Sequence, residues 1–167
     1  MRDFEGKVIV VTGAGGGVGT ALCRQFAERG GTIIAVGRTA AKLESTLAIV
    51  RGLGSQILMI TGDITRAETA ARVADACASL GGVDVLINNA AVGYSYEKMH
   101  PGSMARLGDQ TPDLWRDVVD INLTGPAAIT QALLPKLLER REGANVVFIS
   151  SILSLRGHSN AHAYSAA

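Results

Sequence analysis

The sequence predicts an α/β fold, a Rossmann-like doubly wound parallel sheet with helices on both faces. Short runs rich in Val and Ile alternate with longer stretches whose apolar residues recur at helical spacing, and this alternation is typical of βαβ units. The first, third and fifth of the short runs are nearly continuous in apolar residues, as expected for strands covered by helices on both faces.

The first half of the chain supplies strands and helices in strict alternation. Four β-branched runs are predicted strands: residues 7–12, 32–36, 56–61 and 83–88. Three stretches with apolar residues at helical spacing are predicted helices: residues 17–29, 40–51 and 66–80. Paired glycines end the first and the third of these helices.

The alternation stops at a long polar segment. Residues 92–110 contain Gly and Pro and show no period, which predicts a long loop of the kind that is usually functional or mobile. Two interpretations of its Tyr94, Tyr96 and Met99 stay open: they shape a substrate pocket, or they belong to an interface.

Helix-capping residues and the spacing of apolar residues predict the remaining helices and the last strand. Thr111-Pro112-Asp113 is a helix start, with a capping residue, a proline and an acid in the first turn. It predicts one helix to about residue 122, and the following stretches predict a second helix over 126–141 and a strand over 145–150. Arg140-Arg141 is expected to be a solvated helix end, and residues 151–167 to begin a loop and a further helix.

Composition narrows the class of protein. The chain has 167 residues, 47% of them hydrophobic, 19% charged and 4% aromatic, which fits one globular domain over 1–167 and excludes a disordered chain. The net charge of +1 gives no basic surface for nucleic acid, and no stretch reaches the roughly 20 apolar residues of a spanning helix. Cys23 and Cys77 form no CxxC, so we expect buried thiols, no metal site and a cytoplasmic location.

The first predicted strand runs into a glycine-rich loop, T-G-A-G-G-G-V-G over 12–19. The loop lacks the lysine of a P-loop and the spacing G-x-G-x-x-G, but it fits T-G-x-x-x-G-x-G with Gly13, Gly17 and Gly19. Glycine permits the sharp turn and the close approach of a pyrophosphate, which the helix N-terminus attracts. The alternative is a strand-to-helix turn without a ligand.

The end of the second predicted strand distinguishes between cofactors. Proteins that bind NAD through this fold place an Asp or Glu there, on the ribose 2′-hydroxyl. This chain has Gly37 at that place, followed by Arg38 and Thr39. A guanidinium suits a 2′-phosphate, so the sequence favours NADP and leaves NAD as the alternative.

Four motifs together resemble the short-chain dehydrogenase/reductase family, from Phe4 to the last residue. They are the glycine loop, Asn88-Asn89-Ala90-Ala91 after the fourth predicted strand, Asn122, and Ser151 followed at the family's distance by Tyr164. Ala91 stands where the family has a glycine. The resemblance implies an oxidoreductase that transfers hydride between a nicotinamide cofactor and a carbonyl/alcohol substrate.

The resemblance also implies roles for single residues. Ser151 would hold the substrate oxygen, Tyr164 would be the general acid or base, and Asn122 would interrupt its helix and hold a water of a proton relay. The implied cofactor-binding residues are Gly13, Gly15, Gly17, Val18, Gly19, Arg38, Thr39, Asp63, Ile64, Asn89, Ala90 and Ala91. The family further implies a homodimer or homotetramer built on the helices near 112–141 and from 164 onward.

The chain ends one position before the lysine of the family's Y-x-x-x-K motif. That ammonium favours the phenolate of the tyrosine. A doubly wound dinucleotide fold typically has about six strands, in the order 3-2-1-4-5-6, whereas five are predicted here. We therefore expect a C-terminally incomplete sheet and a longer enzyme that supplies the lysine and a substrate lid. The alternative is a non-catalytic dinucleotide-binding protein.

Overall fold

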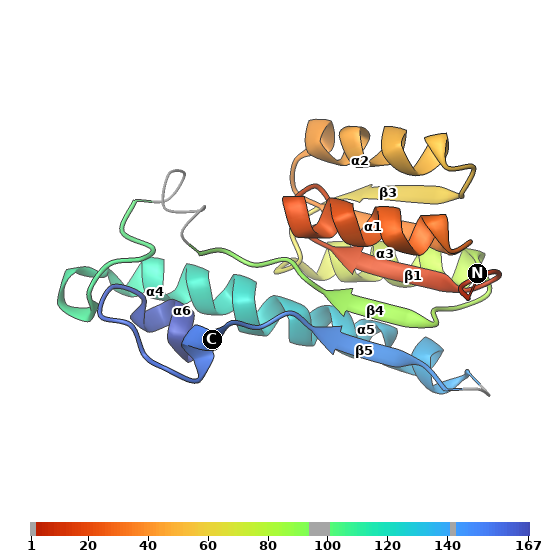
Figure 1. The fold of residues 1–167 in the computed structure, drawn as a ribbon. Coiled ribbons are helices and arrows are strands. Elements are labelled where there is room, and N and C mark those ends of the chain that lie inside the picture. Colours follow the sequence, from red (N-terminus) through yellow and green to blue (C-terminus); the bar gives the residue numbers. More distant parts are fainter. Residues whose placement is uncertain (1–2, 94–100, 141–142) are drawn as a thin grey trace.

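The computed structural model describes residues 3–93, 101–140 and 143–167. Its centre is a parallel sheet of five strands in the order β3-β2-β1-β4-β5 (Figure 1). The strands are β1 (Val8–Thr12), β2 (Thr32–Gly37), β3 (Ile57–Thr61), β4 (Val85–Asn88) and β5 (Asn145–Phe148). The prediction of a Rossmann-like sheet is therefore confirmed.

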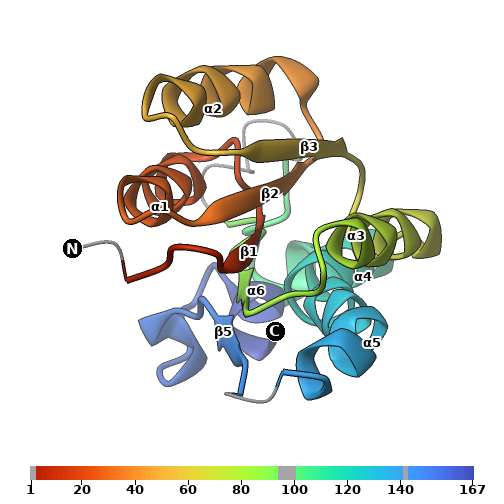
Figure 2. The ribbon, with the colours of Figure 1, turned by 90° about the vertical axis from the view of Figure 1, so that its right-hand side faces the viewer.

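Helices cover both faces of the sheet (Figure 2). The α-helices are α1 (Gly17–Glu28), α2 (Ala40–Gly52), α3 (Ala67–Ser79), α4 (Pro112–Val119), α5 (Gly125–Leu138) and α6 (His162–Ala166). The short 3-10 turns are η1 (Leu107–Asp109) and η3 (Ile152–Ser154), and η2 (Asp120–Thr124) is a π-helical turn.

Alternate residues of β1 to β4 feed two separate cores, because successive side chains of a strand point to opposite faces. In β1, Ile9 and Val11 pack with α1 and α2, whereas Val8 and Val10 pack with α3 and α5. Cys23 lies in the first core and Cys77 in the second. This double covering explains why the sequences of β1 to β4 are almost continuously apolar. The expectation that the fifth run is covered on both faces is wrong, because all four residues of β5 are exposed, Phe148 to 56%.

The second half of the chain departs from the prediction of two separate helices. The π-turn η2 joins α4 to α5, so the helical path continues through residues 120–124 (Figure 1). Pro126 lies at the second position of α5, and because the helical path runs through it, its missing N–H leaves the Asn122 carbonyl without an α-helical partner four residues on. The strand predicted over 145–150 ends at Phe148, opposite Asn88, the last residue of its neighbour β4.

The expectation of a solvated helix end is wrong for Arg140. Its guanidinium lies 3.1 Å from the Asp84 carboxylate and donates to the Val83 carbonyl at 3.2 Å. Asp84 is 7% exposed and also accepts from the Val8 N–H at 2.8 Å. Arg140 thus ties the end of α5 to the amino-terminal side of the sheet. Arg141, Tyr94, Tyr96 and Met99 lie outside the described residues.

Candidate active site and nucleotide cleft

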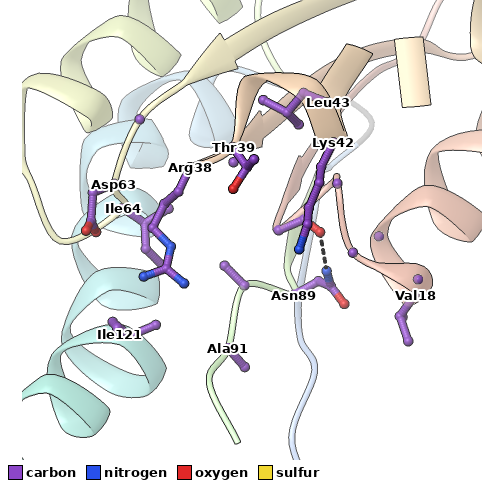
Figure 3. A pocket seen from close by; sticks show the side chains of 18 residues that line it. Val18, Arg38, Thr39, Lys42, Leu43, Asp63, Ile64, Asn89, Ala91 and Ile121 are labelled. Atoms are coloured by element: carbon purple, nitrogen blue, oxygen red, sulfur yellow. Dashed lines mark hydrogen bonds between the residues drawn. The ribbon is translucent and has the colours of Figure 1, made fainter. Parts of the chain in front are cut away.

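A cleft of about 400 Å³ opens at the carboxyl ends of β1 to β4, where ligands bind in doubly wound sheets (Figure 3). Its lining contains all twelve residues that the sequence predicted for cofactor binding: Gly13, Gly15, Gly17, Val18, Gly19, Arg38, Thr39, Asp63, Ile64, Asn89, Ala90 and Ala91. Sequence reasoning missed six further lining residues: Gly16, Gly37, Lys42, Leu43, Gly62 and Ile121.

The glycine loop is packed too closely for side chains at three of its positions, Gly13, Gly15 and Gly19. Gly13 has a φ of 65°, and a Cβ there would lie 2.8 Å from the Ala90 Cα. A Cβ on Gly19 would collide with the carbonyl oxygen of Gly13. The helix α1 that follows has no side-chain cap and no acid in its first turn, so its N–H groups and positive dipole end are available to an anion.

Side chains from three elements fix the shape of this loop. The Asn89 amide donates to the carbonyls of Thr12 at 2.9 Å and Gly13 at 3.3 Å, and the second bond is visible in Figure 3. From α1 and α2, the hydroxyls of Thr20 and Thr46 both donate to the Ala14 carbonyl, at 3.1 and 3.0 Å. The loop is thereby held in place by protein groups alone, a preorganised state for binding.

The end of β2 brings three polar side chains to one edge of the cleft. Arg38 and Thr39 precede α2, and Lys42 lies in its first turn. Figure 3 shows Arg38 and Lys42 on the two sides of Thr39. No acidic residue lies in the first turn of α2, and the Thr39 hydroxyl makes no capping bond. Lys42 could have been found from its helical spacing of three residues from Thr39.

The far end of the cleft combines a carboxylate with apolar contacts. One Asp63 oxygen accepts from the N–H of Thr65 at 2.9 Å and from its hydroxyl at 2.8 Å. This turn fixes the Asp63 side chain and leaves its second oxygen to the cleft. Ile64 is 5% exposed and contacts α5 at Gly125, where a Cβ would lie 2.9 Å from it.

Asn122 lies in the π-turn, as expected for a residue that interrupts its helix. Its Oδ1 accepts from the Val92 N–H at 2.8 Å, and its Nδ2 donates to the Val92 carbonyl at 3.0 Å. The side chain therefore binds the backbone just after the cleft residues 89–91.

Tyr164 and Ser151 lie outside the cleft lining, beyond the carboxyl ends of β4 and β5. Tyr164 is half-buried in α6 and packs against Val92 and Val118. Its ring also lies against Gly93, where a Cβ would be 3.0 Å from the Tyr164 Cε2. The Ser151 Oγ accepts from the Leu153 N–H at 3.2 Å, and the turn that it caps packs against α6.

Two kinds of feature are absent from the described part of the chain. Residues 3–93, 101–140 and 143–167 contain no group of three or more His, Cys, Asp or Glu placed to hold a metal ion. Among the same residues, none of the helices is both long and apolar enough for a membrane span.

Comparison with known proteins decides the family. The sequence profile described as short chain dehydrogenase matches residues 7–167. This chain belongs to the short-chain dehydrogenase family. The match includes the glycine loop, the cleft and the helix that carries Tyr164.

Individual relatives cover nearly all of the chain. Cis-4-hydroxycyclohexanecarboxylate dehydrogenase from Sinomonas cyclohexanicum is 34% identical over 165 residues, covering 98% of this chain and 62% of that protein. Dehydrogenase/reductase SDR family member 4 from Homo sapiens is 33% identical over 153 residues, covering 90% of this chain and 52% of that protein. The chain thus spans about half to three-fifths of the length of these short-chain dehydrogenases.

Solved structures of the same family share the fold. NAD⁺-bound xylitol dehydrogenase superposes with a TM-score of 0.87 at 29% identity, over 98% of this chain and 60% of that one. Carveol dehydrogenase from Mycobacterium avium in complex with NAD superposes with a TM-score of 0.87 at 27% identity, over 98% of this chain and 61% of that one.

Proposed function

We propose that the full-length protein is an NADP-dependent oxidoreductase that interconverts a carbonyl and an alcohol. The observation that carries this proposal is one cleft lined by the glycine loop, by Arg38 and Thr39, and by Asn89. Tyr164 approaches the same region through its contact with Gly93.

The residues of the cleft fit a dinucleotide. The glycine loop has no Cβ at the positions where the chain packs most closely, and the open N-terminus of α1 suits a pyrophosphate. The second oxygen of Asp63 is placed to accept from the amino group of an adenine. When bound, the nicotinamide supplies or accepts the hydride, while the protein positions and polarises the substrate.

Proton transfer to and from the substrate belongs to Tyr164 and the residues around it. Tyr164 donates a proton to the substrate oxygen in reduction and accepts it in oxidation, and the Ser151 hydroxyl holds that oxygen. Asn122 holds the Val92 backbone with its side chain, and its main-chain carbonyl, which faces Pro126 four residues on and so receives no α-helical N–H, would accept from a water of the proton relay. Ala91 in place of the family's glycine adds one methyl at the cleft and is compatible with these roles.

NADP is favoured over NAD by the charge at the end of β2. Gly37 offers no carboxylate to a ribose 2′-hydroxyl, and the adjacent Arg38 supports a 2′-phosphate. NAD is the second candidate, because xylitol dehydrogenase and carveol dehydrogenase were solved with NAD.

Assembly and location are part of the same proposal. The family resemblance places a homodimer or homotetramer interface on the helices near α4 and α5, and α5 exposes Leu134 and Leu138, at 45% and 76%. The free thiols of Cys23 and Cys77 support a reducing, cytoplasmic compartment.

Turnover of the full-length protein with a panel of ketones and aldehydes, followed by NADPH oxidation, tests the activity. Tyr164→Phe is expected to lower kcat by about 10²–10⁴-fold, the contribution of a positioned acid, with NADPH binding retained. Wild-type binding without turnover of any panel member would support a binding protein. Unchanged turnover of Tyr164→Phe would remove Tyr164 from the mechanism.

A further inference from the structure

Lys42 is a cation of the cleft lining that has no role in the proposed function. It lies in the first turn of α2, and its stem rests on the glycine loop: a Cβ on Gly15 would lie 2.8 Å from the Lys42 Cβ. The side chain extends from there into the cleft (Figure 3). Within the described residues, the Lys42 ammonium has neither an ion pair nor a hydrogen bond.

The position is electrostatically unfavourable without a ligand. The N-terminus of a helix carries the positive end of its dipole, so a lysine in the first turn is disfavoured. Arg38 adds a second positive charge at the same edge of the cleft, and the first turn of α2 contains no acid. An anion bound between the two cations would turn this repulsion into attraction.

We propose that Lys42 is a specificity-determining residue that binds the 2′-phosphate of NADP together with Arg38. The inference rests on the proposed nucleotide site. The open N-terminus of α1 is the place for the pyrophosphate, whereas Lys42 belongs to the helix that starts at the end of β2. In this fold the end of β2 meets the adenosine ribose.

The contact with Gly15 gives Lys42 its direction. Because Gly15 has no side chain, the Cβ and main chain of Lys42 pack closely on the loop, and the side chain reaches the cleft from the side of α1 (Figure 3). Arg38 reaches the cleft from the side of Ile64 and Ile121. Two cations from opposite sides can each bind a different phosphate oxygen, with the Thr39 hydroxyl between them.

Dissociation constants of the full-length protein for NADPH and NADH, measured by fluorescence titration at fixed ionic strength, test the proposal. Lys42→Gln is expected to weaken NADPH binding about tenfold, the value of one charge-assisted contact, and to leave NADH binding within about twofold. The matched control is Arg51→Gln, which removes a cation from the last turn of the same helix and is expected to change neither constant.

The outcomes separate this inference from the proposed cofactor. Equal weakening of NADPH and NADH would overturn it, because Lys42 would then bind the shared pyrophosphate. Unchanged constants in Lys42→Gln would also overturn it. A wild-type protein that prefers NADH contradicts the proposed cofactor, and with it the inference, before any variant is compared. Arg38→Gln serves as the reference for loss of a 2′-phosphate contact.

Discussion

The Asn122 side chain makes two hydrogen bonds to the backbone of a single residue, Val92, at 2.8 and 3.0 Å. It joins the π-turn between α4 and α5 to the segment that leaves the end of β4. Because this segment continues from the cleft residues 89–91 to the Tyr164 contact at Gly93, the amide fixes the backbone that connects the cleft with the Tyr164 ring.

Replacement of Asn122 by Leu is expected to destabilise the protein by about 1–3 kcal/mol, since the N–H and the carbonyl of Val92 lose their partners. Chemical denaturation measures the loss, and turnover should fall with it. Gln131→Ala, an exposed change on α5, is the control and should stay within about 0.5 kcal/mol. A stable Asn122→Leu protein would show that the two bonds do not anchor the segment.

Gly93→Ala tests the contact with Tyr164. The new methyl would lie 3.0 Å from the Tyr164 Cε2, so the ring must move by a few tenths of an ångström. We expect kcat to fall roughly tenfold or more, because small displacements of catalytic groups are costly, with NADPH affinity little changed. Gly108→Ala, which has open space around it, should leave both parameters unchanged. Full activity of Gly93→Ala would argue against a fixed Tyr164 ring.

Gly19→Ala is expected to distort the glycine loop, because the added Cβ collides with the Gly13 carbonyl oxygen. Overpacking of this kind costs about 1–3 kcal/mol, and NADPH affinity should fall more than tenfold. Thermal unfolding and NADPH titration measure the two effects. Gly52→Ala at the end of α2 meets no neighbouring atom and should be neutral or slightly stabilising. Wild-type cofactor affinity in Gly19→Ala would contradict the proposed seat of the pyrophosphate.

The two thiols predict a loss of stability at alkaline pH. Burial raises the pKa of Cys23 from 9.0 to about 12. Burial also raises that of Cys77 from 9.0 to about 12, partly offset by the positive charge of Arg140. Between these pH values the unfolded chain releases thiol protons that the folded chain retains. The unfolded state therefore binds fewer protons, and the free energy of unfolding falls as pH rises through this window.

Denaturation of the wild type and of a Cys23→Ala/Cys77→Ala variant across this range isolates the thiol contribution. The wild type should lose more stability than the variant above pH 9.0. In the native protein at neutral pH, both thiols should also resist a thiol reagent that labels them in denaturant. Parallel pH profiles for the two proteins would show that the thiols do not contribute.

The sequence was sufficient to predict the sheet and most of the cleft. Apolar runs and glycine punctuation located five strands, and for β1 to β4 the pattern is strong because these strands are buried on both faces. The residues Gly13, Arg38, Asp63 and Asn89 follow strand ends, and the parallel sheet brings these ends to one edge.

The features that escaped prediction depend on tertiary contacts. The path through the π-turn depends on the bonds of Asn122 to Val92, which lies 30 residues away. The burial of Arg140 depends on Asp84, 56 residues away. Lys42 enters the cleft where α2 packs on Gly15, and the only local signal for it is its spacing of three residues from Thr39.

The most direct test of the account is a calorimetric titration of the full-length protein with NADPH and, separately, with NADH. We expect saturable binding of NADPH at one site per chain, with a dissociation constant about tenfold or more below that of NADH. We also expect 2′,5′-ADP to displace the bound NADPH. Absence of binding by either cofactor at millimolar concentration would contradict the assignment of the cleft.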